Sequence, residues 1–463
     1  MSTPRTFCIR TFGCQMNEHD SERLAGLLVN EGLAPATNEA EADVVIFNTC
    51  TIRENADLKL YSALGHLKAA KAARPSMQIA VGGCIAQHER GRILERARWV
   101  DVVFGTHNLN EAPALLRRAQ VEGPIVDVAD APDPVVTRDM APALSAVREL
   151  PWAAWMTIQT GCDNSCSYCI VPDVRGGEIS RPLADLVTEA RMLAASGVTE
   201  ITVLGQNVNS YGRDLTKRRP LFADLLRALG EVEGIERIRF TSPHPKDLRP
   251  ETIAAMAETA SVCPQLHLPL QSGSNRVLTA MRRGYSAERY LERLAAARAS
   301  IADLAVTTDL IVGYPGETDE DFEATLAVVA EANYDSAYTF IFSPRDGTRA
   351  AAMVDEFVPD EIIKDRFERL KHVLDRSALR AHVAREGHLE EVLLEGPSRR
   401  SQSRWSGRTR QGKLVHVDSD AQLRPGALVE VHVDHGAPYH LMGHVTRVLR
   451  PPRHKVRIAL NVS

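Results

Sequence analysis

Three cysteines in one short segment, GCDNSCSYC, constrain this chain more than any other sequence feature. Cys162, Cys166 and Cys169 form a CxxxCxxC pattern that directly follows a strand-like run. Three thiolates on one loop can ligate three irons of a 4Fe-4S cluster and leave the fourth iron open, whereas ferredoxins use another spacing and a further Cys. A structural zinc site needs four ligands, and no fourth Cys or His follows nearby. The pattern therefore favours an iron–sulfur site open to an exogenous ligand over zinc or unrelated thiols.

Three further cysteines lie far apart in the sequence but in similar surroundings. Cys14, Cys50 and Cys84 each end an apolar, strand-like run and precede a helical pattern, in RTFGC, VIFNTC and IAVGGC. Ligands of open α/β sheets bind where parallel strands end, so these residues can converge on a second three-ligand cluster. The alternative is three buried free cysteines, which are common in protein cores. Cys8 and Cys263 lie inside strand-like runs and are expected to be core residues.

The first third of the chain alternates strand-like and helical patterns, which predicts a parallel sheet covered by helices. The expected strands are Arg5–Phe12, Asp43–Phe47, Gln78–Val81 and Val102–Phe104, and the expected helices include Asn17–Asn30 and Glu54–Ala73. Residues 125–150, rich in Pro and Asp, are predicted to be a linker.

Six strand–helix units follow from about Trp152 to Pro344, which predicts an open, partial barrel because a closed one needs eight. The expected strands are Ala154–Gln159, Glu200–Leu204, Arg237–Thr241, Gln265–Leu268, Ala305–Val312 and Ala337–Phe342. Active sites in such arrays lie at the carboxyl ends of the strands. A long amphipathic helix, Pro359–Glu386, leads out of the array.

The tail from His388 onward changes character, with short strands between Gly/Pro turns that predict a small antiparallel β-barrel. The expected strands are Glu390–Leu394, Leu414–Val417, Leu428–Val433 and Gly443–Val448. The complete chain has a net charge of −5, yet residues 388–463 hold 12 Lys/Arg against 7 Asp/Glu. Residues 397–413 contain six basic residues, no acid and one Trp. This segment suits contact with nucleic-acid phosphates, or it is a solvated loop.

Hydrophobic residues make up 44% and charged residues 25% of the chain, which is typical of a globular protein. The N-terminus lacks an apolar signal core, and no stretch approaches the length of a membrane span. We therefore expect a soluble cytoplasmic protein with no membrane partner, in which thiols stay reduced and can bind metal.

Five longer motifs carry a resemblance to a known family. They are TFGCQMNEHDSE (11–22), NTCTIRENA (48–56), GGCIAQ (82–87), GCDNSCSYCIVPDVRGGEISRP (161–182) and LPLQSGSN (268–275). These motifs resemble the methylthiotransferase family of radical S-adenosylmethionine (SAM) enzymes. The resemblance implies a methylthiotransferase N-terminal domain at 5–121, a radical SAM domain at 148–384 and an RNA-binding TRAM domain at 386–452.

The resemblance also implies an activity, namely addition of a methylthio group to carbon 2 of N6-isopentenyladenosine beside the anticodon of tRNA. It implies two 4Fe-4S clusters, with Cys14, Cys50, Cys84, Cys162, Cys166 and Cys169 as metal ligands and catalytic residues. SAM would both donate a methyl group and supply the radical, because a ring C–H bond has no acidic proton for a base to remove. The implied partners are tRNA, an electron donor such as a flavodoxin-type protein and a sulfur or iron–sulfur delivery system, and a monomer is expected.

Other functions stay open from the sequence. Within the family they are methylthiotransfer to threonylcarbamoyladenosine of tRNA or to an aspartate of a ribosomal protein. Outside it they are a non-catalytic RNA-binding iron–sulfur protein and a structural zinc protein.

Candidate SAM contacts lie where the barrel strands end. They are Gly205, Gln206, Asn207, Ser242, Gln271, Ser274 and Gly313. Glycines allow a ligand to approach the backbone, and amides and hydroxyls offer hydrogen bonds, although each position also fits an ordinary strand-to-helix turn. Arg175 and Arg181, after the cysteine loop, are either anion contacts or solvated. The candidate RNA contacts in the basic tail are Arg399, Arg400, Arg404, Trp405 and Arg408.

Overall fold

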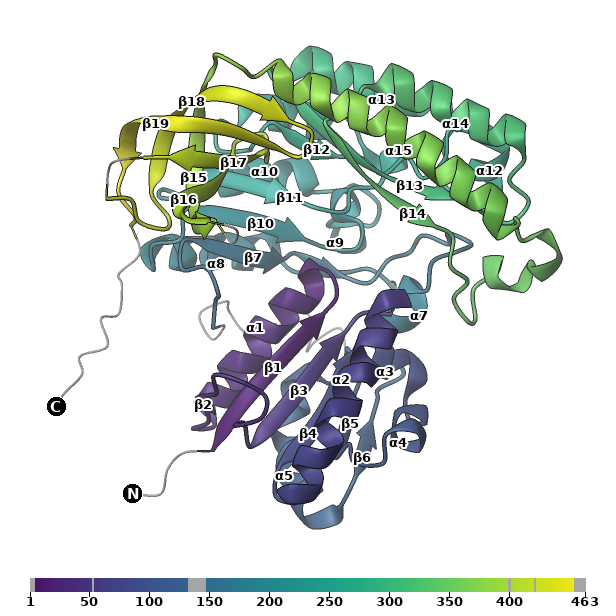
Figure 1. Cartoon of the computed structure of the whole chain (residues 1–463), viewed down its shortest axis with the longest axis vertical. Helices are drawn as coiled ribbons and strands as arrows, with labels where there is room; N and C mark the ends of the chain where they lie inside the picture. The colour runs from purple at the N-terminus through teal and green to yellow at the C-terminus, as the bar shows by residue number, and fades with distance from the viewer. Residues whose placement is uncertain (1–4, 52–53, 132–146, 399–400, 420–421, 454–463) are drawn as a thin grey trace.

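The computed structural model describes residues 5–51, 54–131, 147–398, 401–419 and 422–453. An N-terminal sheet, drawn in purple and blue, points its strands towards a partial barrel in teal and green (Figure 1). A small β-barrel in yellow closes the other end of the partial barrel (Figure 1). No helix in these ranges is long and apolar enough to cross a membrane.

The N-terminal sheet has six parallel strands in the order β2-β1-β3-β4-β5-β6. Its strands are β1 (Thr6–Phe12), β2 (Ala34–Pro35), β3 (Val44–Thr49), β4 (Gln78–Gly83), β5 (Val102–Phe104) and β6 (Ile125–Asp127). The helices between them are α1 (Gln15–Asn30), α2 (Glu54–Ala73), α3 (Cys84–Glu89), α4 (Arg92–Arg96) and α5 (Ala112–Glu122). Strands β3 and β4 are buried along their full length, because helices cover both faces of the sheet.

The partial barrel consists of two three-stranded parallel sheets, β7-β10-β11 and β12-β13-β14. The strands are β7 (Ala153–Thr157), β10 (Glu200–Leu204), β11 (Arg237–Phe240), β12 (Gln265–His267), β13 (Ala305–Val312) and β14 (Ser336–Ile341). An isolated bridge pairs Ile238 of β11 with Val262, three residues before β12 begins. The main covering helices are α8 (Leu183–Ala195), α10 (Phe222–Gly230), α11 (Pro250–Glu258), α13 (Ala287–Ser300), α14 (Asp319–Ala332) and α15 (Asp360–Val383).

The C-terminal barrel is closed, in the order β15-β16-β17-β19-β18. Its strands are β15 (Leu389–Ser398), β16 (Ser401–Thr409), β17 (Leu414–Asp418), β18 (Leu428–Ala437) and β19 (His440–Arg450). Strands β17 and β19 pair in parallel and the other four pairs are antiparallel. The α/β fold class is confirmed, with one correction, because the small barrel is not antiparallel throughout.

One local expectation and one open alternative were wrong. The segment predicted as a linker contributes β6 to the N-terminal sheet, where Ile125 pairs with Val102. The basic segment 397–413, for which a solvated loop was one alternative, contains strand β16, which pairs with β15 and β17. Its alternation is hard to see in the sequence because Trp405 is the one large apolar side chain in it.

Arg237 ties the small barrel to the partial barrel. Its side chain is 2% exposed and donates to Glu391 Oε1 at 2.9 Å and to the Arg408 carbonyl at 2.9 Å. We expect Arg237→Met to lower the free energy of unfolding by about 2–3 kcal/mol, because it leaves buried acceptors without a charged donor. Urea unfolding measures the change.

The exposed pair of Arg227 and Glu258, also 2.9 Å apart, offers a matched control. Arg227→Met should cost less than about 1 kcal/mol, as surface ion pairs do. Equal losses for the two variants would contradict the assigned role of Arg237.

Candidate active site

The N-terminal sheet brings its three separated cysteines together. Neighbouring strands β1, β3 and β4 end in register, with Phe12 opposite Thr49 and Thr49 opposite Gly83. Cys14, Cys50 and Cys84 follow directly at this edge. The Cys50 thiol hydrogen-bonds to Cys14 and lowers the pKa of Cys14 to about 6. Cys14 also lies close enough to Cys84 to influence its pKa, so the three side chains share one site. We call them the N-terminal triad.

An asparagine pair holds the turns that carry this triad. Asn17 and Asn48 are both buried, and Asn17 Nδ2 donates to Asn48 Oδ1 at 3.2 Å. Cys14 in turn donates to Asn17 Oδ1 at 3.5 Å. Gly83 adopts φ +89°, and a Cβ there would lie 2.4 Å from Asn48 Oδ1. A side chain at 83 would therefore displace the pair that orders the cysteines.

The cysteine loop after β8 (Gln159–Thr160) carries the second set. We call Cys162, Cys166 and Cys169 the barrel triad. The amide of Cys169 donates to the Cys166 carbonyl at 3.1 Å, and charges on Cys166 and Cys162 act on Cys169. The loop is anchored by Ser167, whose hydroxyl donates to the Ala280 carbonyl at 2.8 Å. The CxxxCxxC segment thus gathers its thiols on an anchored loop.

The thiols of the barrel triad suit a metal centre. Burial raises the pKa of Cys162 to about 11 and that of Cys169 to about 12. A bound cation offsets this effect because it stabilises the thiolate. Two donors already point at the sulfurs, Asn164 Nδ2 at 3.4 Å from Cys162 Sγ and Arg283 Nη1 at 3.4 Å from Cys166 Sγ. Such hydrogen bonds to sulfur tune iron–sulfur centres.

Cys84 of the N-terminal triad meets the end of the cysteine loop across the interface between the N-terminal sheet and the partial barrel. Cys84 packs with Ile170 and Val174 in one buried cluster, and Ile170 directly follows Cys169 in the chain. Helix α1 packs on β7, where His19 Nδ1 hydrogen-bonds to Thr157 Oγ1 at 2.8 Å. The edge of the sheet that carries the cysteines therefore covers the barrel mouth.

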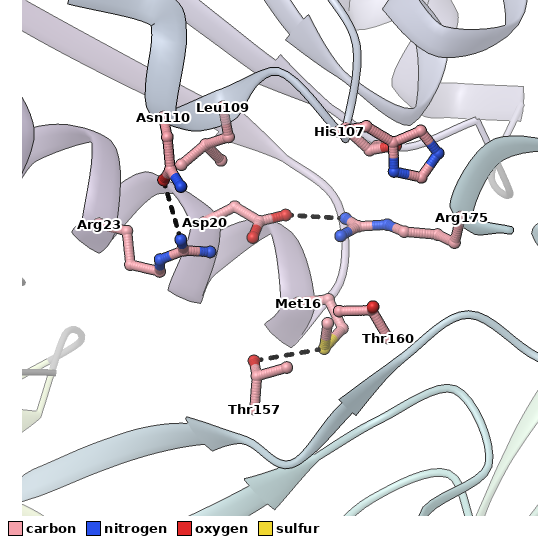
Figure 2. Close-up of a pocket in the computed structure, with 10 residues that line it drawn as sticks. Met16, Asp20, Arg23, His107, Leu109, Asn110, Thr157, Thr160 and Arg175 are labelled. Carbon is pink, nitrogen blue, oxygen red and sulfur yellow. Dashed lines mark hydrogen bonds and ion pairs between the residues drawn. The ribbon is translucent and has the colours of Figure 1, made fainter. Parts of the chain in front are cut away.

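Arg175 extends from the partial barrel into the N-terminal triad. It ends α7 (Val171–Arg175) and is buried. Its guanidinium donates to Asp20 Oδ2 at 2.8 Å, as Figure 2 shows. It also hydrogen-bonds to Cys84 and acts on Cys14 through its charge. Of the two alternatives, the solvated one is wrong for both arginines, because Arg175 is buried and paired with Asp20 at 2.8 Å and Arg181 is buried and paired with Glu189 at 2.6 Å.

A small cavity of about 50 Å³ lies at the same interface (Figure 2). Arg175 and Asp20 line it beside residues from both sides, namely Met16, Arg23, Thr106, His107, Leu109, Asn110, Thr157 and Thr160. The cavity is polar on the Arg175 side and holds room for only a few waters.

The candidate SAM contacts after β10 include two unpaired oxygens. Gln206 Oε1 and Asn207 Oδ1 are buried and have no hydrogen-bond partner in the described part of the chain. Asn207 is fixed by Asp247, to which its Nδ2 donates at 2.9 Å. Gly205 approaches Gln159, whose Cγ would lie 3.0 Å from an added Cβ. Buried acceptors without donors fit a ligand that carries an amino group.

The other candidates differ in their surroundings. Ser242 (φ +59°) and Gln271 (φ +70°) adopt left-handed backbone conformations where β11 and β12 end. Such conformations are uncommon outside Gly and cluster at functional sites. The Ser274 hydroxyl is instead occupied locally, since it caps α12 (Asn275–Ala280) and donates to Asp321 Oδ1 at 2.5 Å. Gly313 faces Ile363, which would lie 2.7 Å from an added Cβ.

The candidate RNA contacts on β16 already interact with other residues of the small barrel. Arg404 pairs with Asp418 and Arg408 with Glu395, each at 2.9 Å on the surface. Trp405 packs partly against the core of the small barrel. Arg399 and Arg400 lie outside the described residues.

Sequence reasoning missed Asn164 and Arg283 as partners of the barrel triad, and Asp20 as the partner of Arg175. Arg283 lies 117 positions from Cys166, so no local pattern links the two. Asp20 and Arg175 both fall within the quoted motifs, which was the available signal.

Comparison with known proteins agrees with this arrangement. Residues 6–105 match a family described as uncharacterized protein family UPF0004, and residues 156–329 match the radical SAM superfamily. A tRNA-2-methylthio-N(6)-dimethylallyladenosine synthase of Mycobacterium bovis is 50% identical over 448 residues, covering 95% of this chain and 86% of the relative. One of Thermobifida fusca is 50% identical over 452 residues, covering 96% and 89%.

Solved structures share the fold at low identity. The radical S-adenosylmethionine methyltransferase TsrM from Kitasatospora setae, solved with cobalamin and a [4Fe-4S] cluster, has a TM-score of 0.52 at 14% identity and covers 75% of this chain and 77% of its own. The resemblance expected from the cysteine motifs is confirmed by the close relatives. The chain belongs to the tRNA-2-methylthio-N(6)-dimethylallyladenosine synthase family of radical SAM enzymes.

Proposed function

We propose that this chain adds a methylthio group to carbon 2 of N6-isopentenyladenosine (N6-dimethylallyladenosine) beside the anticodon of tRNA. The observation that carries the proposal is the contact of Cys84 with Ile170, the residue after Cys169, which supports a common site for the two cysteine triads. Transfer of a sulfur-containing group to a carbon radical needs the sulfur source and the radical source at one place. The activity for which the relatives are named supplies the substrate.

Each triad is proposed to ligate three irons of a 4Fe-4S cluster, with SAM bound at the barrel triad. When bound, that cluster and SAM supply one-electron cleavage of SAM and removal of hydrogen from carbon 2. Asn164 and Arg283 orient the sulfurs of the barrel triad. Arg175 offsets the negative charge of the N-terminal triad, and Gln206 and Asn207 offer acceptors to SAM. The three-domain division at 5–121, 148–384 and 386–452 belongs to this proposal, with β6 (Ile125–Asp127) extending the N-terminal sheet beyond residue 121.

The remaining partners follow from the same chemistry. The tRNA is proposed to contact Arg399, Arg400, Arg404, Trp405 and Arg408 of the TRAM domain, since tRNA modification enzymes must hold the phosphate backbone. Cleavage of SAM needs an electron donor such as a flavodoxin-type protein, and the inserted sulfur needs a sulfur or iron–sulfur delivery system. None of the eight cysteines, all of which lie in the described residues, forms a disulfide, which suits the reducing cytoplasm. A monomer is proposed.

The proposal is tested by expressing the chain in a bacterial strain that lacks its own synthase. Mass analysis of tRNA nucleosides should show that the dimethylallyl nucleoside gains a methylthio group. Vector alone and an inactive barrel-triad variant serve as controls. A methylthio product found only on threonylcarbamoyladenosine or on a ribosomal protein would contradict the substrate, and an absent product with bound zinc would contradict the chemistry.

A further inference from the structure

The last strand of the partial barrel exposes aromatic side chains on its inner face. Ala337 packs with the core under the helices, so the alternating residues Tyr338 and Phe340 point to the opposite, inner side. Their neighbours in register on β13 are Asp309 and Ile311, which alternate in the same way with the buried Leu310. Tyr338 is 62% and Phe340 37% exposed, although both are large and largely apolar.

These side chains lead to the cysteine loop. Ile311 packs on a buried cluster together with Phe342 and Tyr168, and Tyr168 lies between Cys166 and Cys169. We call Tyr338, Phe340 and Ile311 the apolar strip. At the end of the strip farthest from the cysteine loop, the ring of Tyr338 contacts the ring of His267, with 6.4 Å between their centroids. The strip therefore runs along the inner face of the barrel from His267 towards the loop that carries the barrel triad.

The strip also lies on an open side of the barrel. Strand β14 is the end strand of its sheet in the described part of the chain, paired with β13 alone. A substituent entering along this edge meets the strip without crossing another strand. Exposed apolar surface beside a polar rim is typical of a binding site.

We infer that the apolar strip binds the dimethylallyl group of the substrate nucleoside. This inference rests on the proposed function, which places carbon 2 of the same adenine ring beside the barrel triad. A five-carbon hydrocarbon on that ring must pass from water to protein when the base is seated, and the strip is the exposed apolar surface that begins at the cysteine loop. Burial of the group distinguishes the prenylated base from an unprenylated one.

The test compares two variants on neighbouring positions of one strand. Phe340 belongs to the strip, whereas Ile341 is 46% exposed and alternates to the other face. Reconstituted full-length protein is titrated with two anticodon stem-loop RNAs that differ only in the group on N6 of the target adenosine. One carries a methyl group and the other carries a dimethylallyl group. We expect Phe340→Ser to reduce the affinity ratio between these RNAs by roughly 10- to 100-fold.

The controls separate this inference from its alternatives. Ile341→Ser should keep the ratio of the unaltered protein, and Phe340→Leu should keep most of it because leucine is apolar. SAM cleavage without RNA should be unchanged in all three. Equal weakening of both RNAs by Phe340→Ser, or loss of SAM cleavage, would overturn the inference by assigning the strip to the RNA in general or to SAM. If the unaltered protein fails to thiomethylate the dimethylallylated RNA, the proposed function fails instead.

Discussion

Cys162→Ala is expected to abolish both cleavage of SAM and formation of the methylthio nucleoside, with losses of at least about 1,000-fold. Removing one of three thiolates breaks the ligand set on which the proposed radical source depends. The surrounding loop should persist, because the amide of Cys162 still donates to the Gly176 carbonyl at 3.0 Å. Chromatography of 5′-deoxyadenosine after chemical reduction measures the first loss, and nucleoside mass analysis measures the second.

The N-terminal triad gives the contrasting variant. Cys14/Cys50/Cys84→Ala should lose about half of the iron and sulfide after anaerobic reconstitution and make no methylthio product, yet continue to cleave SAM. Cys8→Ala, outside both triads, is the matched control and should keep full iron content. Retention of all iron in the triple variant would contradict two separate clusters.

Arg175→Gln is expected to lower methylthio product by about 100-fold or more while SAM cleavage continues. The guanidinium is buried between Asp20 and the sulfurs of the N-terminal triad. Removing it leaves the Asp20 carboxylate and the sulfurs of Cys14 and Cys84 without their cation. Breaking a buried pair in this way costs about 3–5 kcal/mol. Iron counting should therefore show a deficit at the N-terminal triad, measured against the barrel triad in the same sample.

Arg366 supplies a control of similar burial. It pairs with the buried Glu317 at 3.0 Å, and its side chain is 4% exposed. Arg366→Gln should reduce thermal stability but leave the iron content of the N-terminal triad unchanged. If both variants lose iron to the same extent, the effect of Arg175 is one of general stability and its assigned role is wrong.

The convergence of the N-terminal triad could be predicted because it depends on simple regularities. Each cysteine follows a strand, and parallel strands end at one edge. The sequence does not say which strands are neighbours, and the observed order places β1, β3 and β4 side by side. The barrel triad was more directly visible, since its spacing is local.

Contacts between distant segments could not be predicted in this way. The sequence left open whether Arg175 contacts an anion or is solvated, because its environment depends on how the sheet docks on the barrel. No periodicity in the sequence encodes that docking. Ser274 was a candidate for SAM, yet its hydroxyl bonds to Asp321, 47 positions away. The solvated-loop alternative for the segment that forms β16 stayed open because a strand on a small barrel needs few apolar side chains when its partners supply the core.

The position of Arg175 in the chain has a consequence for biogenesis. The ribosome completes the N-terminal sheet and its three cysteines before it adds Arg175, which comes 91 positions after Cys84. During that interval the nascent sheet presents thiols without the guanidinium that faces them in the finished protein. Maturation of this centre is thus expected to follow docking of the middle third of the chain, after translation has passed the cysteine loop.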